Sequence, residues 1–186
     1  MAARCARWRL PPGITLRPID DADLAFLSDL YASTRWEELA PVPWSEADKR
    51  RFLHQQHTLQ HRHYQAHYAD AEFLLLQRDG ESIGRIYVHR SPGEIRLMDI
   101  ALLPAFRRRG LGAALIGELV AEADAAGLPV TLHVERDNPA QHLYARHRFL
   151  LEEDGEVYQK LRREPGPASV QDQLEVREIA SQPPRA

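Results

Sequence analysis

The stretch DIALLPAFRRRGLGA, residues 99–113, decides the fold of this chain. Its apolar first half is typical of a buried strand, and Pro104 favours the end of that strand. A turn containing Gly110 and Gly112 follows, and apolar residues then recur at helical spacing from Leu111. The sequence therefore predicts a strand, a glycine-bearing turn and an amphipathic helix in immediate succession.

This turn has the properties of an anion-binding site. The first backbone N–H groups of a helix have no partner inside it, and the helix dipole places partial positive charge there. Glycines at 110 and 112 let a ligand approach the backbone, because they carry no Cβ. Arg107, Arg108 and Arg109 add cationic charge. We interpret the segment as a site for a pyrophosphate.

Two common phosphate-binding motifs are excluded. A Walker-type loop needs Gly-Lys-Ser or Gly-Lys-Thr, and neither triplet occurs in the sequence. A dinucleotide fingerprint needs a third glycine, but Leu115 stands at that position. The pyrophosphate therefore belongs to another class of ligand.

Outward from this stretch, the periodicities predict an α/β fold with a mixed central sheet and helices on both faces. Asp20 and Ser45 are expected to cap the first two helices, and Asp79-Gly80 is expected to form a hairpin turn. The expected order is β-α-α-β-β-β-α-β-α-β, with strands over 14–19, 73–76, 82–89, 95–103, 130–134 and 157–161.

Composition excludes several classes of protein. A net charge of -3 and a pI near 6.3 give no basic surface for nucleic acid, and no apolar run approaches the roughly 20 residues of a membrane span. The only cysteine, Cys5, cannot form an internal disulfide, so we expect a cytoplasmic protein. We expect one domain over 13–163, with an N-terminal extension over 1–12 and a tail over 164–186.

Arg107-x-x-Gly110-x-Gly112 resembles the Arg/Gln-x-x-Gly-x-Gly/Ala signature of the GNAT superfamily of acyl-CoA N-acyltransferases. Leu102-Leu103-Pro104 is similar to the end of that family's central strand. The segment from Asn138-Pro139-Ala140 through Tyr144 to Phe149 is similar to its Asn…Leu-Tyr…Gly-Phe segment. One departure is Arg148, where the family usually has glycine. The resemblance covers about residues 13 to 163 and implies the GNAT fold.

The resemblance implies an N-acetyltransferase with acetyl-CoA as co-substrate and an amine of a small molecule, peptide or protein as acceptor. Tyr144 is implied as the acid that protonates the departing thiolate, since a phenol stays protonated at pH 7. Asn138 is implied to contact the pantetheine arm or the helix start. Backbone groups are implied to bind the cofactor's pantetheine arm at Ile100, Ala101 and Leu102 and its pyrophosphate at Arg107, Arg108, Arg109, Gly110, Leu111, Gly112 and Ala113.

A base must take the proton of the attacking amine. Asp99 is preferred, because an unpaired carboxylate among apolar neighbours would be costly. Glu94, His133 and Glu135 are the other candidates. A structural role for Asp99, as the ion-pair partner of an arginine such as Arg96, stays equally open.

Two further groups of residues are conspicuous. His54, His57 and His61 share one face of the second helix, which we interpret as a polar face, with no metal expected. Residues that fall where the family lines its acceptor pocket are Trp36, Glu37, Glu38, Trp44 and Tyr64. The alternative function is an acyl-CoA-binding module without turnover, which thiol release with a panel of amines would distinguish. A homodimer is compatible with the sequence.

Overall fold

The computed structural model describes residues 8–166, which form two compact units. The first unit contains residues up to 91 together with 96–115, and the second contains 92–95 and the residues from 116 onward. The strands are β1 (Ile14–Pro18), β2 (Glu72–Arg78), β3 (Glu81–Arg90), β4 (Ile95–Leu102), β5 (Val130–Glu135), β6 (Leu150–Asp154) and β7 (Tyr158–Arg163). The helices are α2 (Leu24–Arg35), α3 (Glu46–His67), α4 (Leu111–Ala126) and α5 (Gln141–Arg146), with short 3-10 turns at Asp21–Asp23, Glu37–Leu39 and Pro104–Phe106.

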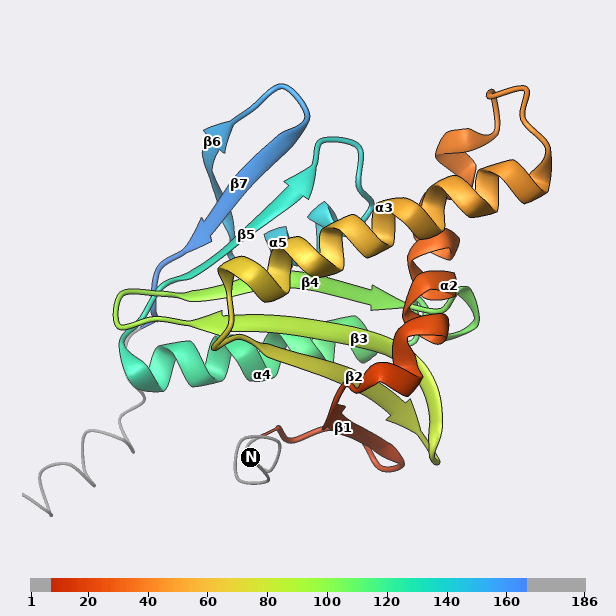
Figure 1. Ribbon diagram of the computed structural model, residues 1–186. Coiled ribbons are helices and arrows are strands. Elements are labelled where there is room, and N and C mark those ends of the chain that lie inside the picture. Colours follow the sequence, from red (N-terminus) through yellow and green to blue (C-terminus); the bar gives the residue numbers. More distant parts are fainter. Residues whose placement is uncertain (1–7, 167–186) are drawn as a thin grey trace, which may run out of the picture. The chain divides into compact units, whose positions relative to one another are not determined.

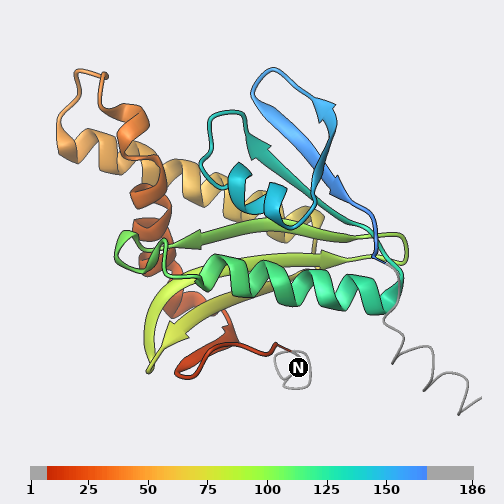
Figure 2. The same ribbon diagram turned by 180° about the vertical axis from the view of Figure 1, so that it is seen from behind.

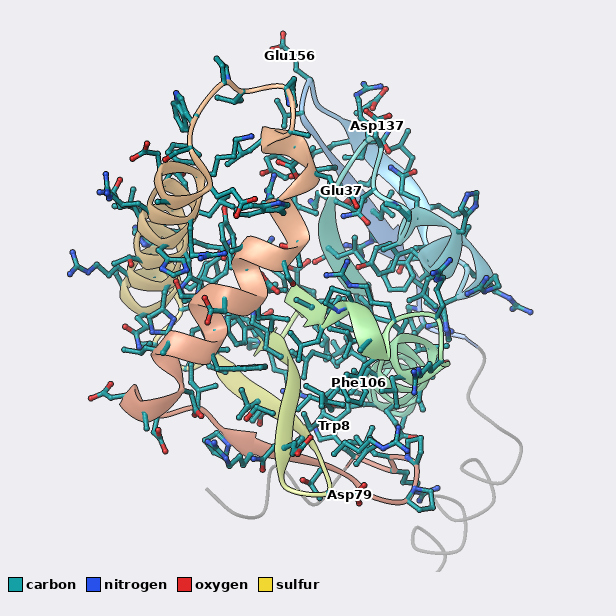
Figure 3. The ribbon with its side chains drawn as sticks, turned by 90° about the vertical axis from the view of Figure 1, so that its right-hand side faces the viewer. Trp8, Glu37, Asp79, Phe106, Asp137 and Glu156 are labelled. Carbon is teal, nitrogen blue, oxygen red and sulfur yellow. The ribbon has the colours of Figure 1, made fainter. Side chains whose placement is uncertain are left out.

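The first unit is built on strands in the order β1-β2-β3-β4. β2 pairs antiparallel with both β1 and β3. The predicted hairpin turn between β2 and β3 is confirmed: Asp79 and Gly80 have φ of 51° and 87°, the two positive values that a tight type I′ turn requires. Figure 3 shows Asp79 at the tip of this hairpin.

Helices α2 and α3 lie over one face of these strands (Figure 1). The predicted cap of α3 is confirmed, whereas the predicted cap at Asp20 serves the 3-10 turn that precedes α2. The Asp20 side chain accepts from Ala22 N–H and is part of a capping box with Asp23. Ser45 Oγ accepts from Asp48 N–H at the start of α3. The side chains between these helices and the sheet include Leu27, Leu30 and Leu53, all buried.

The beginning of α4 lies on the opposite face of the first unit's strands (Figure 2). Leu111 and Leu115 in its first turns are buried, and so are Leu119 and Ala123 further along the same stripe. Helices cover both faces of these strands. The residues of β2 and β3 are therefore buried along most of each strand, rather than alternately buried and exposed. The predicted mixed α/β class is confirmed.

The second unit contains the remainder of α4, α5 and strands in the order β5-β7-β6. Both of its strand pairs are antiparallel. Gly127, with φ of 64°, ends α4: Leu128 N–H donates to Ala123 C=O at 2.9 Å and Gly127 N–H donates to Asp124 C=O at 3.2 Å. This pair of bonds is a Schellman motif, in which glycine takes the left-handed position at no steric cost.

The expected order of elements lacked one strand, β6. All five of its residues, Leu150–Asp154, are exposed, so no alternation of buried and exposed side chains marks them as a strand. The last strand begins and ends slightly later than predicted, at Tyr158–Arg163.

Only part of each predicted terminal segment lies within the described residues. Trp8, inside the expected N-terminal extension, is buried. The expected tail lies outside the described residues beyond Gly166, and Cys5 lies outside them as well. Within residues 8–166, no helix is long and apolar enough to span a bilayer.

Candidate cofactor and catalytic site

The turn between β4 and α4 is held in place by the side chain of Arg107. Its Nε donates to Leu102 C=O at 2.8 Å, and its Nη2 lies 3.3 Å from both the C=O and the Oγ of Ser33 in α2. We expected Arg107 to add cationic charge to an anion site. Its guanidinium donates to neutral protein oxygens, so it keeps its positive charge beside the turn and also fixes the turn relative to β4 and α2.

The backbone of this turn opens toward solvent. Arg108 and Gly110 have φ of 57° and 83°, and a Cβ built on Gly110 would meet no atom within 4 Å. The helical ladder includes the bond from Ala114 N–H to Gly110 C=O at 2.9 Å. The N–H groups of the preceding first turn, at Leu111, Gly112 and Ala113, therefore have no partner within the helix. An anion has room to approach them over Gly110.

The end of β4 lies unusually close to β3. A Cβ on Gly84 would lie 2.5 Å from Ala101 C=O and 2.7 Å from Leu102 Cδ2, contacts that no side chain tolerates. Leu103 N–H donates to Ile83 C=O at 2.9 Å just beyond this point. Gly84 is thus the residue that lets the strand carrying Ile100–Leu102 sit where it does.

Asp99 forms a two-pronged ion pair with Arg85 of β3. Arg85 Nε donates to Asp99 Oδ1 at 3.1 Å and Arg85 Nη2 donates to Asp99 Oδ2 at 2.9 Å. The Arg85 side chain is only 3% exposed and that of Asp99 is 15% exposed. Asp99 therefore does pair with an arginine, but with one on the neighbouring strand; Arg96 donates instead to the hydroxyl of Tyr68.

Tyr144 lies in α5 of the second unit and is 5% exposed. The end of α5 repeats the Schellman motif of α4: Phe149 N–H donates to Tyr144 C=O at 3.1 Å and Arg148 N–H donates to Ala145 C=O at 3.0 Å. The rings of Tyr144 and Phe149 meet edge to face with centroids 5.7 Å apart. The motif fixes the backbone at Tyr144, and the contact with Phe149 restrains its ring.

Arg148 takes the left-handed position of this motif, with φ of 63°, where α4 has glycine. The strain of a non-glycine residue there is about 1–2 kcal/mol, and glycine would enlarge the unfolded ensemble at a cost of up to about 1 kcal/mol. We therefore expect Arg148→Gly to raise the free energy of unfolding by roughly 0.5 kcal/mol, measured by urea denaturation. Arg148→Ala, which keeps the Cβ, should give no such gain. A loss of a kilocalorie or more in Arg148→Gly would contradict the assigned backbone.

Asn138 was expected at the pantetheine arm or at the helix start, and it does form contacts at the helix start. Its Oδ1 accepts from Ala140 N–H at 2.9 Å, and its C=O accepts from Gln141 N–H at 3.0 Å. Gln141 in turn donates through its side chain to Glu135 C=O and Arg136 C=O. These bonds anchor the start of α5, the helix that carries Tyr144.

The polar-face interpretation of the three histidines is wrong for two of them. His57 and His61 are buried, with rings stacked 5.8 Å apart, whereas His54 faces Asp29 at the surface. His57 also contacts the ring of Tyr31 at 5.7 Å. Within residues 8–166, no cluster of His, Cys, Asp or Glu side chains is placed to hold a metal ion.

Burial lowers the pKa of His57 to about 4, with Arg85 and His61 adding to the effect, and burial also lowers the pKa of His61. The unfolded chain, with a histidine pKa near 6.5, therefore binds more protons than the folded one between pH 6.5 and 4. Stability should fall as the pH falls through this window, by roughly 3 kcal/mol from His57 alone.

Urea denaturation at pH 7.0, 5.5 and 4.5 measures this loss, and His57→Phe should reduce the slope while retaining a ring against Tyr31. Carboxylates change the stability of the protein in a different pH range. Hydrogen bonds from Arg17 lower the pKa of Asp23 below its ordinary 3.8, so the stability that it contributes is lost only in more acidic solution. An identical slope in the parent and His57→Phe would contradict a neutral buried His57.

The residues expected to line an acceptor pocket lie around α2 and α3. Trp44 is 46% exposed and packs edge to face on Phe52, and Arg50 lies over the ring of Trp36. Figure 3 shows Glu37 just after α2, and Tyr64 donates to Met98 C=O of β4. Glu37 and Glu38 are exposed, whereas Trp36 and Tyr64 are half-buried.

An open hollow of about 770 Å³ runs along α3. All of its lining residues come from that one helix, so it is a surface groove rather than an enclosed site. Neither Trp36 nor Tyr64 lines it.

The chain has a mixed α/β fold in which Arg107 fixes the turn between β4 and α4, and a family model matches most of it. The chain belongs to the Acetyltransferase (GNAT) family, whose model matches residues 20–149.

One known protein resembles this chain over a short stretch of sequence, and two solved structures resemble it in fold. A mycothiol acetyltransferase of Thermobifida fusca is 46% identical over 50 residues, which are 27% of this chain and only 16% of that protein. The paia N-acetyltransferase of Thermoplasma acidophilum, solved in complex with coenzyme A, is 20% identical with a TM-score of 0.60 over 81% of this chain and 98% of that one. A Salmonella typhimurium enzyme that modifies the N-terminal serine of a ribosomal protein is 16% identical with a TM-score of 0.57 over 84% and 97%. The two structures share the fold with this chain.

Proposed function

We propose that this protein transfers an acetyl group from acetyl-CoA to an amine of a small molecule, peptide or protein, in the cytoplasm. The observation that carries the proposal is the turn at 107–113. Arg107 holds it against β4, two residues with positive φ shape it, and the space over Gly110 is open. This geometry fits the pyrophosphate of a CoA ester bound by the first N–H groups of α4.

The adjacent strand supplies the second part of the proposed cofactor site. Backbone groups at Ile100, Ala101 and Leu102 would bind the amides of the pantetheine arm in the manner of an added strand. The contact that Gly84 permits sets the position of this backbone. Asn138 would act indirectly, through the start of α5.

The proposed chemistry forms one C–N bond and breaks one C–S bond. A neutral amine attacks the thioester carbonyl, Asp99 accepts the proton that the nitrogen then carries, and Tyr144 protonates the departing thiolate. Asp99 can still accept a hydrogen bond, because a carboxylate has about four acceptor positions and Arg85 uses two of them. The Tyr144 ring is already held by Phe149.

Release of free thiol from acetyl-CoA, followed with a panel of small amines and peptides, tests this function. Turnover that depends on both the amine and acetyl-CoA is the expected result. A rise in melting temperature with acetyl-CoA but no thiol release with any amine would instead indicate a binding module.

A further inference from the structure

The side chain of Arg85 is the most deeply buried cation of the first unit whose partners are described. It lies on β3, beside Asp99 on β4, and its fork of Nε and Nη2 meets both carboxylate oxygens. Such a paired arrangement fixes the plane of the carboxylate as well as its distance, which a single contact does not.

Arg85 is itself held from several sides. Nη2 also lies 3.3 Å from Gln60 Oε1 of α3. The guanidinium carbon is 5.1 Å from the ring centroid of Tyr87 and 6.0 Å from that of Tyr31. The other titratable groups that interact with the guanidinium are His57, His61 and Tyr64, all on α3. Of all these neighbours, only Asp99 is an anion.

The orientation of Asp99 is therefore set by Arg85. Asp99 immediately precedes the backbone proposed to bind the pantetheine arm, at Ile100–Leu102, and its carboxylate is partly exposed. The guanidinium occupies two of the hydrogen-bond acceptor positions of the Asp99 carboxylate. Only its remaining lone pairs can therefore receive a hydrogen bond from the N–H of the substrate amine. A carboxylate free to rotate would meet that N–H in the productive geometry for only part of the time.

We propose that Arg85 is a positioning residue for acetyl transfer, acting through Asp99, which it orients toward the acceptor amine. This role rests on the proposed function. It differs from a purely structural ion pair, because a structural pair would change stability without lowering kcat at a nearly constant KM and without coupling to Asp99 in turnover.

Arg85→Lys keeps the charge but loses the fork, and Arg85→Gln also loses the charge. We expect both to lower kcat by roughly tenfold or more while the KM for acetyl-CoA changes less than about twofold. In an Asp99→Asn background, Arg85→Lys should cause no further loss of kcat.

Arg90→Lys is the matched control. Arg90 also lies on β3, with its side chain 20% exposed, and pairs with Glu72 at 2.8 Å; its substitution should lower stability without altering kcat. If the Arg85 variants do not fold, Gln60→Leu removes one contact of the guanidinium and should shift kcat in the same direction by a smaller factor.

Equal kcat in a folded Arg85→Lys or Gln60→Leu, or losses that add to that of Asp99→Asn, would overturn the positioning role and leave the proposed function standing. A parent enzyme that releases no thiol with any amine would overturn both.

Discussion

Gly112→Asp should abolish the stabilisation of this protein by acetyl-CoA. At a concentration one hundred times its dissociation constant, a ligand that binds only the folded state stabilises it by about 2.7 kcal/mol. An aspartate at 112 places a carboxylate among the first N–H groups of α4, where the phosphate oxygens are proposed to bind. A hundredfold weaker affinity would reduce the stabilisation at that concentration to roughly 0.4 kcal/mol.

Thermal unfolding with acetyl-CoA, CoA, ATP and NAD measures this effect. Gly93→Asp is the matched control. Gly93 lies just before the start of β4, and a Cβ built on it would meet no atom within 4 Å. The control should retain the full shift with acetyl-CoA. A folded Gly112→Asp that binds acetyl-CoA as well as the parent would show that the pyrophosphate is bound elsewhere, and equal shifts from all four ligands would remove the specificity for CoA.

Tyr144→Phe should slow turnover by roughly ten- to a thousandfold, while acetyl-CoA binding stays nearly unchanged. A positioned general acid contributes about 10²–10⁴ to a rate, and water can replace part of it. The substitution keeps the ring that packs on Phe149, so α5 should retain its end. The lost hydroxyl therefore accounts for the change in kcat.

Tyr158→Phe is the control for Tyr144→Phe. It removes the hydroxyl of a half-exposed tyrosine in β7 and should leave kcat unaltered. Steady-state kinetics of both variants, with thiol detection, gives the comparison. Unchanged kcat in Tyr144→Phe would mean that another group protonates the thiolate.

Local sequence signals predicted most of the fold correctly, because each acts over a few residues. Asp79-Gly80 carries its own turn geometry, and Ser45 caps α3 through a contact three residues away. The left-handed residue at 148 also follows from position alone, since the family has glycine there. Such features need no knowledge of distant parts of the chain.

Contacts between elements could not be predicted in the same way. The partner of Asp99 is Arg85, which depends on how β3 and β4 are aligned, whereas only the near neighbour Arg96 was an evident candidate. His57 and His61 are polar residue types, but on the folded α3 their rings are buried and stack on each other. The inward direction of the Arg107 side chain likewise depends on α2, far away in the sequence.

The strand that the sequence did not reveal, β6, lies at the end of the strand order in the part of the chain that the structure describes. Leu150 and Leu151 are exposed on it, and exposed apolar edge strands are templates for intermolecular sheet growth. Three acidic residues follow, and the pairing with β7 shifts at Glu152, where the ladder is irregular. Charge and irregularity are the usual protections of an edge strand against aggregation. The acidic residues and the irregular pairing of β6 therefore oppose the addition of another strand at this edge, although they add nothing to the core.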